Sequence, residues 1–109
     1  MIVKDKLVSD ALAYLAQDPH PIAVARKAVM DAENDTKENF ARALLDASGS
    51  VAEKQATATV DAAHVIAKDS EAEAVLDLER HRARVRAAEM IIEVWRSENA
   101  NARAAERVR

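Results

Sequence analysis

The chain has 109 residues, a hydrophobic fraction of 50% and a net charge of −3. It contains no Cys, which excludes disulfides and thiolate nucleophiles or metal ligands. Much of the hydrophobic content is Ala, and aromatic residues make up only 3% of the chain. With a single Gly and two Pro among many helix formers, this composition is typical of long helices and coiled coils. No segment approaches the roughly 18 uninterrupted apolar residues of a membrane span. We therefore expect one soluble, all-α domain over residues 1–109 that does not act on a membrane.

The first expected helix spans residues 3–17. Val3, Leu7, Ala11 and Leu15 recur at the spacing of one helical face. The sequence Asp-Pro-His-Pro at 18–21 should end this helix, because a proline disfavours the α conformation in the residue before it.

The second expected helix spans residues 21–47, since a proline fits the first turn of a helix. Its apolar positions include Ile22, Val29, Phe40 and Leu44. The polar stretch at 34–39 has little to bury, so the sequence leaves a bend there open.

Ser48-Gly49-Ser50 is the clearest turn signal. Glycine readily adopts the left-handed conformation after a helix, and Ser50 with Glu53 forms an S-x-x-E capping box. The third expected helix spans residues 51–107, with an interruption at 68–70 as the alternative, because Ser70 and Glu73 repeat the capping pattern. The predicted fold is a helical hairpin with a short N-terminal and a long C-terminal helix that forms a coiled-coil-like dimer.

An apolar stripe in the second half of the long helix predicts self-association. An antiparallel hairpin would leave this half uncovered, and the short first helix was expected not to reach it. Exposed large apolar side chains are each unfavourable by about 1.5–3 kcal/mol, so a second chain should cover the stripe. The predicted self-association residues are Leu78, Val85, Ala88, Ile91, Ile92, Trp95 and Asn99.

Charge is divided along the chain. Residues 1–78 carry a net charge of −6 and residues 79–109 a net charge of +3. An acidic block precedes an arginine block, and an antiparallel homodimer centred near Leu78 and Glu79 would neutralise both. The predicted charged docking residues are Asp69, Glu71, Glu73, Asp77, Arg80, Arg82, Arg84 and Arg86.

The sequence predicts no catalytic, metal or cofactor site and no small-molecule substrate. It contains no phosphate loop, nucleophile elbow or dinucleotide fingerprint, and its single glycine follows a helix. His20, His64 and His81 lack a recognised metal-ligand spacing, and His64 with Asp61 was expected to form a surface hydrogen bond.

Two segments, residues 50–54 and 88–103, together resemble small helical accessory proteins of bacteriophages and prophages. The Ile-Glu-Val-Trp-Arg core at 92–96 is the most specific part. The resemblance implies a phage-encoded protein of the bacterial cytoplasm, from a region concerned with DNA metabolism or host interaction.

The primary functional hypothesis is a non-enzymatic interaction protein that self-associates through its long helix and docks on a macromolecular partner. One alternative is an inhibitor of, or accessory to, a nucleic-acid-processing enzyme, such as a host-defence nuclease or recombination machinery. The other is direct nucleic-acid binding through arginines 80–86, whose phosphate contacts would dominate affinity. The alternation of these arginines spreads them over two helix faces, which weakens this second alternative.

Overall fold

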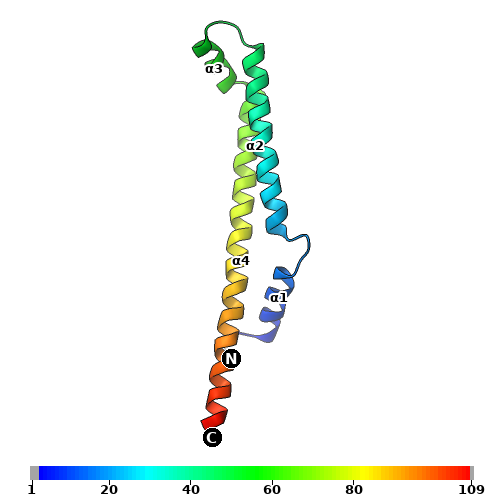
Figure 1. The fold of residues 1–109 in the computed structure, drawn as a ribbon, viewed down its shortest axis with the longest axis vertical. Coiled ribbons are helices and arrows are strands. Elements are labelled where there is room, and N and C mark those ends of the chain that lie inside the picture. The colour runs from blue at the N-terminus through cyan, green and yellow to red at the C-terminus, as the bar shows by residue number, and fades with distance from the viewer. Residues whose placement is uncertain (1–2, 109) are drawn as a thin grey trace. The chain divides into compact units, whose positions relative to one another are not determined.

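The computed structural model describes residues 3–108, and every regular element in that range is an α-helix (Figure 1). The helices are α1 (Asp5–Leu15), α2 (Pro21–Asp46), α3 (Val51–Thr59) and α4 (Ala62–Val108). The all-α hairpin with a short N-terminal and a long C-terminal helix is confirmed. The polar middle of α2 does not interrupt it, and the break after α1 falls at the predicted prolines.

The predicted helix over 51–107 is divided into two, which corrects the expectation of one continuous helix. The break lies at Val60 and Asp61, and α4 passes without interruption through 68–70. The Asp61 carboxylate accepts hydrogen bonds from the backbone N–H groups of Ala63 (3.1 Å) and His64 (3.2 Å). Asp61 is therefore the N-cap of α4, and its bond to residue 64 involves the backbone and not the imidazole.

The first turn of α3 is capped as the sequence predicts. The backbone N–H of Glu53 donates to the Ser50 hydroxyl oxygen at 3.2 Å, and that hydroxyl donates to the Glu53 carboxylate at 3.1 Å. Gly49 precedes the cap with φ of 109°, a conformation that favours glycine. The side chains of Ser50 and Glu53 thus fix the start of α3.

Replacing Ser50 with alanine should lower the free energy of unfolding by about 1 kcal/mol, because the Glu53 N–H then loses its acceptor. Chemical denaturation measures the loss, and amide hydrogen exchange should show it concentrated in α3. Ser50→Asp is the matched control, since a carboxylate can accept the same bond. A Ser50→Asp variant as unstable as Ser50→Ala would contradict the assigned cap.

The tertiary contacts group the chain into two compact units, residues 22–79 and residues 1–21 with 80–109. In the first of these, α2 and the N-terminal part of α4 form the hairpin, and the rings of Phe40 and His64 pack 5.2 Å apart. Ala25, Ala58, Ala67 and Leu78 are buried. Three of these four are alanines, so the helices gain little buried apolar area from each contact.

His64 is buried in this hairpin, and its Nδ1 has no hydrogen-bond partner among the described residues. An unsatisfied buried polar atom is destabilising by about 1–3 kcal/mol. His64→Leu should therefore raise the midpoint of thermal unfolding, because leucine fills a similar space against Phe40 and has no polar atom. Circular dichroism against temperature measures the shift, and a lower midpoint would contradict it.

The second unit packs α1 on the C-terminal half of α4. Ala11 and Tyr14 of α1 form a buried cluster with Ala88 and Ile92 of α4, flanked by Leu15, Val85 and Ile91. The expectation that the first helix could not reach this stripe is wrong. α1 has only 11 residues, but two small alanines let the helices approach, and Tyr14 is buried in the same cluster.

Candidate protein interface

Tyr14 connects α1 with the arginine segment of α4. Its ring lies edge-on to His20, with 4.9 Å between ring centroids, and its hydroxyl shares a 3.2 Å hydrogen bond with Nδ1 of His81. The guanidinium carbon of Arg84 lies 4.0 Å from the centroid of the Tyr14 ring, a cation–π contact. Two members of the segment 80–86 therefore stabilise the fold of the chain itself.

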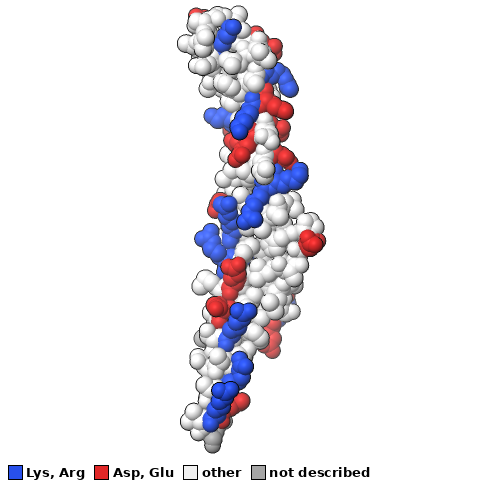
Figure 2. All heavy atoms as spheres, in the orientation of Figure 1, with Lys and Arg blue, Asp and Glu red and all other residues white. Residues whose placement is uncertain are grey.

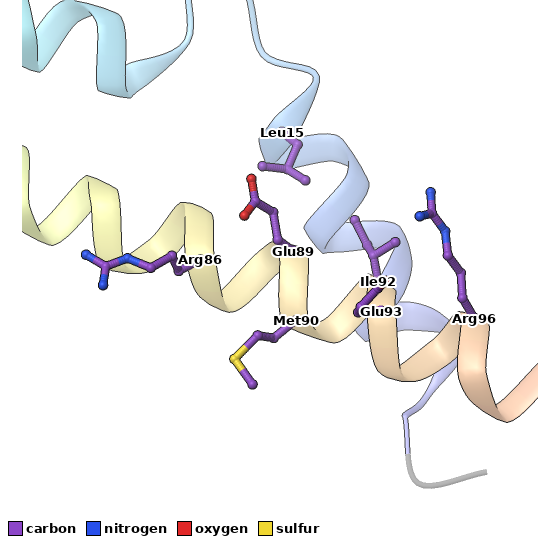
Figure 3. Close-up of a pocket in the computed structure, with 7 residues that line it drawn as sticks. All are labelled: Leu15, Arg86, Glu89, Met90, Ile92, Glu93 and Arg96. Atoms are coloured by element: carbon purple, nitrogen blue, oxygen red, sulfur yellow. The ribbon is translucent and has the colours of Figure 1, made fainter.

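An open groove of about 550 Å³ lies beside the α1–α4 cluster. Leu15 and Ile92 form its apolar floor, and Figure 3 shows Glu89 and Ile92 projecting toward α1. Met90 projects to the opposite side of α4 in the same view. The remaining lining residues are the charged side chains Arg86, Glu93 and Arg96.

The predicted self-association residues lie on or beside the face of α4 that packs within the chain. Leu78, Ala88 and Ile92 are buried. The others are half-buried, namely Val85, Ile91, Trp95 and Asn99. The stripe was predicted to have no cover within the chain, and this is wrong, because α1 covers Ala88 and Ile92. The buried residues of the stripe are therefore not available to a second chain.

This packed face, the inner row, follows a heptad spacing of alternating three and four residues along α4. It consists of His64, Ala67, Glu71, Ala74, Leu78, His81, Val85, Ala88, Ile92, Trp95 and Asn99. Every member is buried or half-buried. Glu71, predicted to dock on another molecule, is one of them and is half-buried.

A second heptad row, the outer row, lies two residues after each inner-row position from His64 to Ile92; the next two positions of the same spacing, Ser97 and Asn101, are polar. A step of two residues turns a helix by about 200°, so the outer row occupies the opposite face of α4. Its members are Ile66, Asp69, Glu73, Leu76, Arg80, Ala83, Ala87, Met90 and Val94, and all are exposed. The relative exposure is 65% for Ile66, 45% for Leu76 and 68% for Met90.

The sequence analysis missed the outer row, although its spacing is visible in the sequence. Either row satisfies a heptad pattern, and only burial distinguishes the face that folds the chain from the face that remains exposed. Such outward positions of a packed helix are ordinarily polar. Here six of nine are apolar, which identifies the outer row as the strongest candidate interface.

The predicted charged docking residues fall into different environments. Asp69, Glu73 and Arg80 belong to the outer row, and no side-chain hydrogen bond or ion pair joins them to any residue in the range 3–108. Asp77 and Arg82 are exposed but already interact within the chain. Arg86 is exposed at the rim of the groove, and Arg84 contacts Tyr14.

Opposite charges are interspersed on the face shown in Figure 2, where Lys and Arg side chains alternate with Asp and Glu. Within the described part of the chain, no group of three or more His, Asp or Glu side chains is placed to hold a metal ion. No helix among residues 3–108 is long and apolar enough to cross a bilayer.

No protein-family model, curated protein or solved structure matches this chain.

Proposed function

We propose that this protein is a non-enzymatic interaction protein that self-associates through the outer row of α4 and docks on a further macromolecule. The observation that supports the proposal is the apolar outer row itself. The hairpin and the α1 cluster use the inner row, so the fold does not require apolar side chains on the opposite face. A binding role explains why Ile66, Leu76 and Met90 stand there.

Burial of these three side chains would stabilise a complex. Complete burial of a large aliphatic side chain contributes about 1.5–3 kcal/mol, and the three retain between 45% and 68% of their surface exposed. In a symmetric dimer both copies contribute, so the apolar term doubles. Ala83 and Ala87 would let the two helices approach closely, as small residues do in tightly packed helix pairs.

The proposed setting is the bacterial cytoplasm, with a host or phage protein as the further partner, in keeping with the resemblance of residues 50–54 and 88–103 to phage accessory proteins. Inhibition or assistance of a nucleic-acid-processing enzyme is one form that such docking could take. Direct nucleic-acid binding has less support, because Arg84 lies over Tyr14 and Arg82 already interacts within the chain.

Sedimentation velocity on the purified chain tests self-association. We expect a species of twice the 11.9 kDa chain mass at micromolar concentration. Leu76→Lys should shift the population to the single chain, since it puts a charge into the proposed interface. Leu76 is 45% exposed, so the far-ultraviolet circular dichroism of the variant should match that of the parent. A single-chain mass for the parent across this range would overturn the proposal.

A further inference from the structure

We infer that two copies of the chain pair antiparallel along the outer row, with the two-fold axis at Leu76, so that Glu73 of each copy faces Arg80 of the other. This inference rests on the proposed self-association and adds its orientation and register. It also moves the axis from the predicted position near Leu78 and Glu79, because Leu78 is buried within the chain.

The order of residues in the outer row determines the orientation. Two acidic residues, Asp69 and Glu73, precede Leu76, and Arg80 follows it. A parallel pair in register would place Glu73 against Glu73 and Arg80 against Arg80, and like charges at an interface are unfavourable. An antiparallel pair brings the acidic part of one helix to the basic part of the other.

The register follows from comparing which outer-row residues of the two copies face one another, each facing pair being one layer of the interface. With Leu76 opposite its own copy, Glu73 lies opposite Arg80, Asp69 opposite Ala83 and Ile66 opposite Ala87. An axis one layer later would pair Arg80 with itself, and an axis one layer earlier would pair Glu73 with itself. An axis at Ala83 would place Glu73 opposite Val94 and Arg80 opposite Ala87, which leaves both charges against apolar side chains.

The unpaired state of these charges in the single chain supports the same register. Asp69 and Glu73 are like charges four residues apart, a spacing that mildly destabilises an isolated helix. Neither side chain has an ion pair or hydrogen bond to another described residue, and the same holds for the side chain of Arg80. In the proposed pair Arg80 of the second copy faces Glu73. Asp69 lies opposite Ala83 of the second copy, which is within one helical turn of that same Arg80.

Cysteine cross-linking tests the register, because the chain contains no Cys of its own. Leu76→Cys should form a covalent dimer on mild oxidation, since the two sulfurs meet at the axis. Ala83→Cys is the matched control: at about 1.5 Å per residue, its two copies would lie roughly 20 Å apart, beyond the 7 Å Cα separation that a disulfide allows. Asp69→Cys mixed with Ala83→Cys should give the mixed dimer only.

Charge reversal provides a second measurement. Glu73→Arg and Arg80→Glu should each raise the dimer dissociation constant about tenfold or more, and the double variant should restore it. If the parent dimerises but Leu76→Cys does not cross-link, or Ala83→Cys cross-links to itself, the register is wrong while self-association stands. If Glu73→Cys and Ala83→Cys each cross-link to themselves, the pair is parallel and in register. A monomeric parent would overturn both proposals.

Discussion

Replacing Tyr14 with alanine is expected to release α1 from α4 and to lower the free energy of unfolding by about 3 kcal/mol. Tyr14 is the largest member of the buried cluster with Ala88 and Ile92, and only 4% of its surface is exposed. The ring also contacts His20 and Arg84. Alanine at this position would remove all of these contacts from a helix of only 11 residues.

Chemical denaturation measures the loss for Tyr14→Ala, and amide hydrogen exchange should show the lowest remaining protection in α1. Tyr14→Phe is the matched control, because it keeps the ring and removes only the hydrogen bond to His81, which contributes about 1 kcal/mol. The packing role would be contradicted if both variants lost the same stability or if α1 stayed protected in Tyr14→Ala.

Replacing Leu78 with alanine should destabilise the chain by about 2–3 kcal/mol, whereas the same change at Leu76 should leave the folding of a single chain nearly unaltered. The two leucines lie two residues apart on opposite faces of α4. Leu78 is 7% exposed and Leu76 is 45% exposed. The other buried apolar residues of the hairpin are alanines, which cannot extend to fill a cavity.

Denaturation at a concentration below the dimer dissociation constant separates the two effects. Under these conditions Leu76→Ala should unfold with the parent, and at higher concentration it should dimerise more weakly. Leu78→Ala should be less stable at both concentrations. Equal losses for the two variants in the single chain would contradict the assignment of inner and outer rows.

The helix ends that follow local chemistry were predictable from the sequence. The prolines at 19 and 21 separate α1 from α2, and Gly49 with Ser50 separates α2 from α3. Each of these signals depends on backbone conformation or on a side chain that bonds to a nearby N–H group. The observed ends lie within two residues of those expected, as helix ends usually do.

The break at Val60 and Asp61 was missed because the capping pattern in the sequence occurs at a different place. Ser70 with Glu73 matches the capping box, yet α4 continues through it. Asp61 lacks the pattern and nevertheless caps α4. The residues before it, Thr59 and Val60, are β-branched and weaken a helix slightly, a preference too small to place a boundary alone.

The packing of α1 was missed because helix lengths were compared in place of side-chain volumes. A short helix can cover part of a long stripe when the facing side chains fit. Ala11 and Ala88 are small enough for close approach, and Tyr14 is buried in the same cluster. Tertiary contacts of this kind depend on the shape of both surfaces, which the periodicity of one helix does not contain.

The division of α4 into two opposite rows has a consequence for how such a protein can change under selection. Substitutions on the outer row can alter which surface the helix recognises while the folded chain persists, since those side chains are exposed. Substitutions on the inner row should destabilise the fold, because a larger side chain in place of a packed alanine does not fit there. Changes along one side of this single helix should therefore alter binding, and changes along the other side should alter stability.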